Sequence, residues 1–182
     1  MSNFLKKIWF VVLLAPIMIG CADYNIDIAE IDNEAALMMD VASVEIIPYA
    51  GADSAIMPVS AGDLTKQWFE RKIKASNRGD KRFVVEITDA RTYRNPKSTN
   101  VKFNAYTTEI KVNYRLYEPE KNLAIMTADS VLQMTREVKK DASIADEDKF
   151  FALTHRQLLE RMNKEFPTQI EKYFNQHIAM MR

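Results

Sequence analysis

The chain has 182 residues, with 25 Lys and Arg and 25 Asp and Glu, so its formal net charge at pH 7 is zero. This length fits one domain, or one domain with a tail, and a neutral chain is not typical of a dedicated nucleic-acid-binding protein. The single cysteine excludes an internal disulfide framework and any multi-cysteine metal site. Four glycines leave little material for a phosphate-binding loop.

The first 20 residues have the pattern of a secretory signal peptide. Lys6 and Lys7 precede an uncharged apolar stretch over residues 8–19. A transmembrane helix needs about 20 such residues, whereas the shorter stretch fits the h-region of a signal peptide. Pro16 inside it also fits a signal peptide better than a straight transmembrane helix. We therefore expect residues 1–20 to be removed from the mature protein.

The apolar stretch ends in Met18-Ile19-Gly20-Cys21, which resembles the lipobox of bacterial lipoproteins. The resemblance implies that diacylglycerol is attached to the Cys21 thiol, that the chain is cleaved after Gly20, and that the new N-terminus is acylated. Several acyl chains, at about 0.8 kcal/mol per buried CH₂, would anchor the protein to a membrane. An ordinary signal peptide, or an uncleaved anchor with an incidental cysteine, is the alternative.

The residue after the cysteine bears on localisation. In the sorting rule of enteric bacteria, Asp directly after the lipidated cysteine retains a lipoprotein at the inner membrane. Ala22 occupies that position here. We therefore expect a lipid-anchored protein at the outer membrane, facing the periplasm.

Residues 21–40 contain six acidic residues and no Lys or Arg. This composition predicts an acidic, partly ordered tether between the lipid and the folded domain. A first strand or helix is the alternative, because Ile26, Ile28 and Ile31 are not typical of linkers.

Residues 41–182 are expected to form a single domain. A short strand is predicted over 41–48, where β-branched residues precede Pro48. The residues over 49–61 include glycine, proline and serine and are expected to form a loop.

A helix is predicted from Gly62 or Asp63 to Ser76, with Asp63 or Ser60 as its N-cap. Its apolar residues cover a broad face, which predicts that the helix lies flat on a sheet. These residues are Leu64, Trp68, Phe69, Ile73 and Ala75.

Three strands are predicted next. Apolar and polar residues alternate over 82–93, and most clearly over 103–117. Residues 118–122 are expected to form a hairpin turn, and residues 123–138 the returning strand. Alternation is weaker in that last strand, which predicts a bulge.

The C-terminal part is predicted to form a second helix. Ser143 and Asp146 resemble a capping box, and a broad apolar stripe follows. Pro167 should kink or restart the helix, and the stripe continues to Ile178. The expected order is β-α-β-β-β-α, an α+β fold with two helices packed on one face of a mainly antiparallel four-stranded sheet.

Two strings are similar to an uncharacterised family of small proteobacterial lipoproteins, chiefly of the alphaproteobacterial type. They are Trp68-Phe-Glu-Arg-Lys-Ile73 and Arg136-Glu-Val-Lys-Lys-Asp-Ala-Ser-Ile144. The resemblance covers residues 41–178, and Pro167 departs from the unbroken final helix that it implies. The element order also looks like the lipoprotein partner of the lipopolysaccharide-export barrel and the auxiliary lipoproteins of ABC-type lipid transporters. It implies an envelope lipoprotein without a defined activity.

The sequence contains no motif of an enzyme, a metal site or a cofactor site. His155 and His177 are 22 residues apart, so they lack the His-Glu-x-x-His spacing of a zinc-binding helix. Cys21 is expected to be acylated and therefore unavailable as a nucleophile. Asp146 and Glu147 stand at a helix start, where negative charge needs no catalytic explanation. We expect no catalytic residue, no metal and no cofactor.

Basic residues outnumber acidic ones by eleven to four between positions 66 and 102. Arg91, Arg94 and Lys97 in this region are candidates for a surface that binds an anionic ligand, such as lipopolysaccharide or anionic phospholipid. A solvated face, balanced by the acidic parts of the chain, is the alternative.

The expected function is that of a non-catalytic envelope lipoprotein that binds a protein partner or assists assembly at the outer membrane. A lipid- or lipopolysaccharide-binding auxiliary subunit of an envelope transport system is the alternative. A small periplasmic enzyme would need a polar constellation that only the fold could assemble.

Overall fold

A computed structural model of the chain describes residues 26, 28–31, 35–51, 60–96, 101–119 and 121–179. Its main sheet has the order β2-β4-β5-β6. β2 pairs in parallel with β4, and the other two pairings are antiparallel. The strands are β2 (Ser43–Ile47), β4 (Arg82–Arg94), β5 (Phe103–Tyr117) and β6 (Ala124–Lys139).

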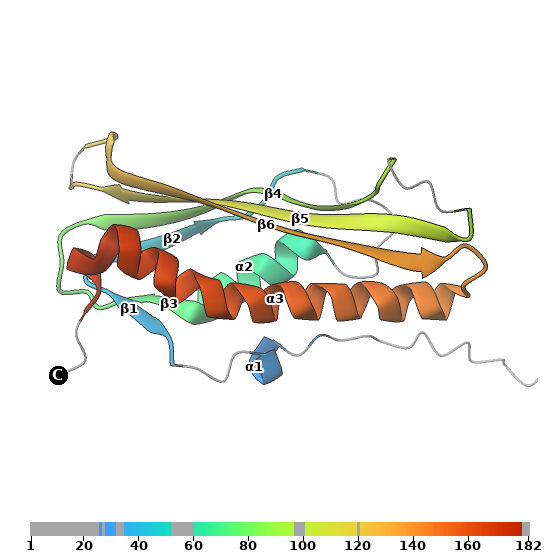
Figure 1. Cartoon of the computed structure of the whole chain (residues 1–182). Helices are drawn as coiled ribbons and strands as arrows, with labels where there is room; N and C mark the ends of the chain where they lie inside the picture. Colours follow the sequence, from blue (N-terminus) through green and yellow to red (C-terminus); the bar gives the residue numbers. More distant parts are fainter. Residues whose placement is uncertain are drawn as a thin grey trace, which may run out of the picture.

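Helices α2 (Ala61–Lys72) and α3 (Ile144–Phe174) lie on one face of this sheet (Figure 1). The order β2-α2-β4-β5-β6-α3 confirms the predicted α+β fold with two helices on a mainly antiparallel sheet. We call the face of the main sheet that is turned away from these helices the outer face.

Four short elements were not predicted separately: α1 (Ile28–Ile31), β1 (Leu37–Met39), β3 (Ile73–Ala75) and the 3₁₀ turn η1 (Asn175–His177). β1 pairs in parallel with β3 in a two-stranded sheet. The predicted helix up to Ser76 therefore ends earlier, because β1 offers hydrogen-bonding partners to the residues after Lys72.

The segment predicted as a tether contributes two of these elements. Ile28 and Ile31 of α1 and Met39 of β1 are buried, and α1 packs against α2 and α3. Figure 1 shows α1 on the side of the helices opposite the sheet. Much of residues 21–40 lies outside the described residues, so the tether stays a prediction. At α1 the protein has three layers: the sheet, the two long helices and α1 itself.

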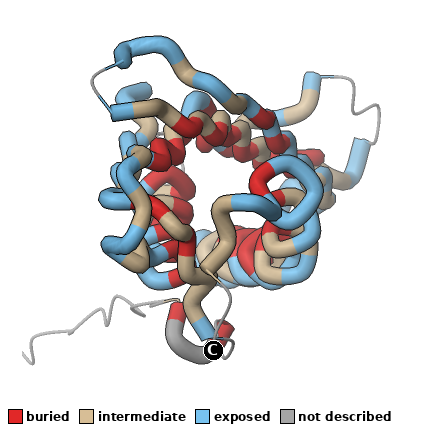
Figure 2. Tube along the Cα trace, turned by 90° about the vertical axis from the view of Figure 1, so that its left-hand side faces the viewer, coloured by how far each residue is buried: buried red, intermediate tan, exposed pale blue. Residues whose placement is uncertain are grey.

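An aromatic cluster joins these layers. The rings of Trp68 and Phe69 on α2 lie 5.4 and 5.5 Å from that of Phe166 on α3, and the Phe69 ring lies 6.1 Å from that of Tyr114 on β5. Each of these three contacts is edge-to-face, a geometry that adds roughly 0.5–1.5 kcal/mol per pair beyond area burial. In the end-on view of Figure 2, buried residues lie where sheet and helices face one another.

Both long helices begin at a serine cap. The Ser60 hydroxyl accepts a hydrogen bond of 3.0 Å from the Asp63 backbone N–H, which makes Ser60 the cap of α2. The Ser143 hydroxyl accepts one of 3.2 Å from the Asp146 N–H. The same hydroxyl donates to the Asp146 carboxylate at 2.7 Å, in place of the reciprocal backbone bond of a full capping box.

Pro167 lies inside α3, which continues to Phe174, so the helix does not restart there. Figure 1 shows the axis turning toward the sheet at the C-terminal end. A proline removes the N–H that would bond to the carbonyl four residues earlier, here that of Asn163, and so permits a bend.

The sheet contains two β-bulges. The predicted bulge in the returning strand lies at Ile125, since Leu116 pairs with Met126 and Tyr117 with Ala124. A second bulge in β4 leaves Thr88 without a partner, between residues paired with Val112 and Lys111.

Two glycine substitutions provide a test of the packing. A Cβ on Gly79 would press against the backbone carbonyl of Asp40 and lie 3.0 Å from Val41 Cα, so main chain would have to move. A Cβ on Gly62 in α2 would meet only contacts of 3.4 Å or more. We expect Gly79→Ala to lower the free energy of unfolding by at least about 1 kcal/mol. Gly62→Ala should leave it unchanged or raise it by about 0.5–1 kcal/mol. Urea unfolding measures both, and equal effects would contradict the close approach at Gly79.

Candidate functional site

The predicted site residues fall into two groups. Gly20 and Cys21, the proposed cleavage and lipidation residues, lie outside the described residues, as does Lys97. Arg91 and Arg94 are described, and both lie near the C-terminal end of β4.

Charges on the outer face are paired with one another across strands. Arg82 Nη1 lies 2.7 Å from Glu45 Oε2, joining β4 to β2. Arg115 Nη2 lies 2.8 Å from Glu86 Oε2, joining β5 to β4. These groups are partly exposed, so each pair contributes roughly 0–1 kcal/mol. Their main effect is that the outer face has no large region of one sign.

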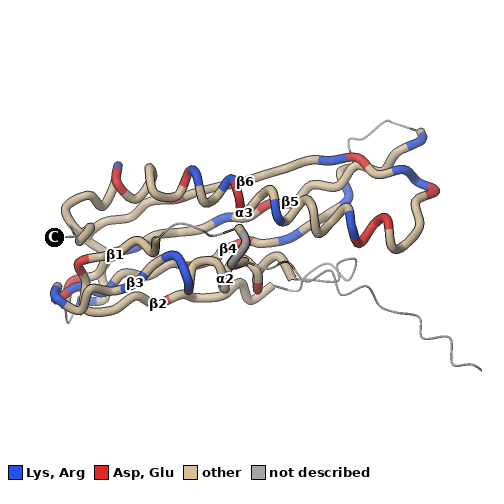
Figure 3. The backbone as a smooth tube through the Cα atoms, turned by 90° about the horizontal axis from the view of Figure 1, so that it is seen from below, with Lys and Arg blue, Asp and Glu red and all other residues tan. Residues whose placement is uncertain are grey.

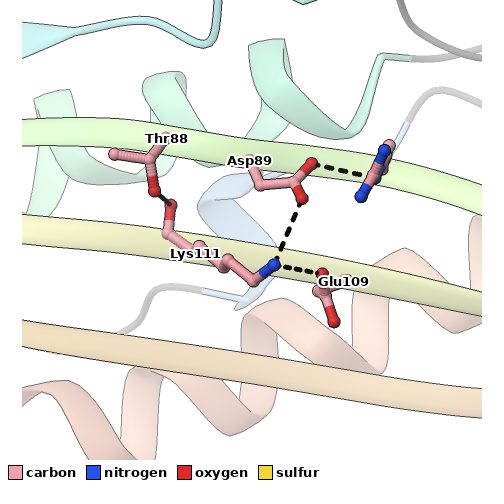
Figure 4. A network of polar contacts seen from close by, with 5 residues as sticks. Thr88, Asp89, Glu109 and Lys111 are labelled. Atoms are coloured by element: carbon pink, nitrogen blue, oxygen red, sulfur yellow. Dashed lines mark hydrogen bonds and ion pairs between the residues drawn. The ribbon is translucent and has the colours of Figure 1, made fainter.

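Asp89 is the centre of the most connected of these groups (Figure 4). Its carboxylate lies 3.5 Å from Lys111 Nζ and 3.2 Å from Arg91 Nε. Lys111 Nζ also lies 2.6 Å from Glu109 Oε1, and this hydrogen bond is the main reason why the pKa of Lys111 is raised. The charge of Arg91 is therefore compensated locally by Asp89, and its guanidinium lies 5.7 Å from the centre of the Tyr93 ring.

The bulge at Thr88 makes this arrangement possible. Strand residues alternate between faces, and Ile87 is buried toward the helices. In a regular strand without the bulge, Asp89 would lie two positions after Ile87 and would point into the same apolar core. The bulge restores Asp89 to the outer face, and the Thr88 hydroxyl donates to the Lys111 carbonyl at 3.3 Å.

Arg94 does not share a surface with Arg91. They are three positions apart in β4, so strand alternation places them on opposite faces of the sheet. Arg94 pairs with Tyr106, whose ring lies 5.1 Å from that of Phe151 on α3. The structure thus does not bring the predicted residues Arg91 and Arg94 together.

Arg94 instead lines a hollow of about 300 Å³ at the end of the sheet. We call it the Arg94 hollow; its lining is Arg94, Asn95, Pro96, Phe103, Asn104, Ala105 and Lys140. The side-chain oxygen of Asn104 is buried and has no hydrogen-bond partner among the described residues. No carboxylate of the described residues forms an ion pair with Arg94 or Lys140. Two cations and two side-chain amides therefore line one concave surface.

Sequence reasoning missed Lys140. The antiparallel register pairs Phe103 with Lys139, which brings the turn after β6 beside the start of β5. Strand 103–117 and the returning strand were both predicted. Pairing their residues outward from the hairpin turn could have placed Lys140 beside the start of strand 103–117, and so near Arg94. The bulge at Ile125 shifts that pairing by one residue.

A second hollow, of about 430 Å³, lies between β2, β3 and the end of α2. Its charged lining residues are Glu70 and Lys74, and Lys74 Nζ donates to the Glu70 backbone carbonyl. Glu70 comes from the last turn of α2 and Lys74 from β3, and these two residues give the hollow no excess of either charge.

Histidines lie apart from both hollows. His155 is 3% exposed on the core side of α3, and burial lowers its pKa to about 4. The pKa of His177 is also lowered, mainly by burial. Within the described ranges, no group of three or more His, Cys, Asp or Glu residues could hold a metal ion. No described helix is both long enough and apolar enough to cross a membrane.

Comparison with known proteins found no matching family model and no matching curated protein. Several solved structures that are similar to this chain are bacterial lipoproteins. A minor lipoprotein from Acinetobacter baumannii has a TM-score of 0.41 at 14% identity, covering 77% of this chain and 97% of that one. Rare lipoprotein B from Shewanella oneidensis has a TM-score of 0.40 at 11% identity, covering 71% and 94%.

Lipoprotein GNA1162 from Neisseria meningitidis has a TM-score of 0.28 at 9% identity, covering 64% of this chain and 97% of that one. At this level of similarity, none of these structures assigns a function to the chain.

The burial of His155 predicts a pH-dependent stability. Its pKa is depressed in the folded state, from 6.5 to about 4, so the unfolded state binds more protons between these values. Stability is therefore lost as the pH falls through that window, by about 2 kcal/mol for this residue between pH 7 and pH 5. His155→Leu should reduce the loss by that amount in urea unfolding at the two pH values. His177→Gln, at a less buried site, should change it less; an unchanged loss in His155→Leu would contradict the assignment.

Proposed function

We propose that this chain is a bacterial envelope lipoprotein, anchored through lipid on Cys21 and without catalytic activity. The observation that carries the proposal is the position of its single cysteine, directly after the 8–19 apolar stretch and after Gly20. A single cysteine can form neither an internal disulfide nor a multi-cysteine metal site. Lipid attachment to the thiol would give Cys21 a role that needs no second cysteine.

The folded part is suited to binding a protein partner at the outer membrane or assisting assembly there. Burial in the core lowers the pKa of His155, and this histidine lines neither of the two hollows described above. The outer face combines paired charges with two exposed apolar side chains of β6, Ile125 and Val131, which are 42% and 59% exposed. Apolar residues set among paired charges resemble the composition of non-obligate protein interfaces.

Lipidation is tested by Cys21→Ala in cells supplied with a labelled fatty-acid analogue. We expect the wild-type chain to incorporate the label, to lose residues 1–20 and to fractionate with the outer membrane. The variant should remain an unlabelled precursor, because acylation needs the thiol. Ser130→Ala, which leaves the N-terminus intact, is the control and should label like the wild type. Label retained by Cys21→Ala would refute the proposal.

A second candidate function, binding of an anionic lipid headgroup, is favoured by the Arg94 hollow. Arg94 and Lys140 enter it from segments far apart in the sequence, and Phe103 supplies an apolar wall. A phosphate group could accept hydrogen bonds from both cations. In this form the candidate no longer needs Arg91, whose charge is compensated by Asp89.

Vesicle flotation of the unlipidated Cys21→Ala chain tests this candidate. We expect binding to vesicles with anionic phospholipid to weaken as salt rises, and to fall at least about tenfold in Arg94→Gln/Lys140→Gln, since each lost charge-assisted bond contributes about 1.5–3 kcal/mol. Arg91→Gln is the matched control and should bind nearly as well as the parent. Equal losses in both variants would point to the net charge of the chain and exclude the hollow.

A further inference from the structure

The position of α1 limits how the domain can lie on a membrane. Ile28 and Ile31 are 5% and 6% exposed because α1 packs against α2 and α3. Figure 1 places α1 beneath the helices, on the side away from the sheet, and near the middle of the length of α3. The chain is thus held to the body of the protein only a few residues after Cys21.

Covalent geometry sets the reach of the lipid. Seven residue steps separate Cys21 from Ile28, and a fully extended chain spans at most about 3.6 Å per residue. The anchored cysteine therefore lies within about 25 Å of α1. This bound holds for any conformation of the residues between them.

The layers of the protein are comparable with that reach. Packed helices are about 8–10 Å apart, and stacked layers are about 10 Å apart. From α1 through α2 and α3 to the sheet is therefore roughly 20 Å, before the side chains of the outer face are added. The connecting segment would have to travel around the domain, which is longer still. It is too short to let the outer face rest on the bilayer.

The ends of the domain are also remote. α3 has 31 residues, about 46 Å at 1.5 Å per residue, so either end is roughly 23 Å from its middle. Standing on one end would require the segment after Cys21 to be almost fully stretched, at a large cost in conformational entropy.

We infer that the bilayer lies broadside along the helical layer, on the side of α1, and that the outer face of the sheet points away from the membrane. The inference rests on the lipid attachment at Cys21 proposed above, and it names the surface from which that lipid leaves the domain. The partner of the helical side is the bilayer surface, and the outer face is left for a protein partner.

The charges of α3 fit a surface held near a membrane by its tether. Arg156 Nε lies 3.3 Å from Glu160, and Arg161 Nε lies 2.6 Å from Glu165. Figure 3, which views this side, shows Lys and Arg interspersed with Asp and Glu along the helices. Such a surface neither attracts nor repels anionic headgroups strongly, so the reach of the lipid decides the orientation.

Single cysteines test the orientation in the mature, lipidated protein reconstituted in phosphatidylethanolamine–phosphatidylglycerol vesicles. Acylation blocks the Cys21 thiol, so an introduced cysteine is the only reactive one. Lys164 on α3 and Gln133 on β6 are both exposed, and Gln133 lies on the outer face. Each of Lys164→Cys and Gln133→Cys is labelled with a donor fluorophore, and energy transfer to acceptors on lipid headgroups is measured.

We expect transfer from position 164 to exceed that from position 133 at least about twofold. Equal transfer, or stronger transfer from 133, in protein that is acylated and floats with the vesicles would overturn the inference. Protein whose mass shows no acylation would instead refute the proposed lipid attachment, so the two failures are distinguishable.

Lengthening the segment between Cys21 and α1 provides a second test of the orientation. Inserting twelve Gly and Ser residues between Ala22 and Asp23 adds about 20 Å of root-mean-square reach. We expect the ratio of the two transfer efficiencies to fall toward one. A ratio that survives this insertion would contradict the short connection as the cause of the orientation.

Discussion

The aromatic contact between α2 and α3 is the interaction on which the remaining structure depends. Trp68 and Phe69 come from one helix and Phe166 from the other, and the rings of Phe69 and Phe166 both contact that of Tyr114 on β5. Because both helices are fixed to one face of the sheet at this point, their remaining sides can be covered by α1, and the segment that follows α3 can meet β1. The isolated bridge between Met39 and Ile178 closes that arrangement.

The long elements could be predicted because their residues carry the information locally. Alternation over 103–117 depends only on which side chains point inward, and Ser60 and Ser143 cap their helices within one turn. β1 and β3 could not be predicted in this way, since each has three residues and each becomes a strand only because the other lies beside it. The loss of the last turn of the predicted first helix has the same cause.

The candidate site was harder to predict for a related reason. The face of the sheet to which a side chain points depends on the alternation along its strand. One bulge shifts that alternation for every residue that follows. Arg91 and Arg94 are close in sequence and both basic, yet β4 directs them to opposite faces. Lys140 is remote in sequence and becomes a neighbour of Arg94 through the register of β5 with β6. The proposed lipidation at Cys21 is inferred from consecutive residues and not from a folded surface, so the sequence alone suffices to propose it.

The bulge at Thr88 also has a consequence for comparing this chain with distant relatives. A homologue that lacks both the bulge and its extra residue keeps the equivalent apolar residues in the core, because regular alternation then continues across this point. An alignment without gaps would then place its buried positions against the exposed ones of this chain from residue 89 onward. Two sequences with the same architecture would share little residue-by-residue similarity along half of β4, although neither had changed its fold.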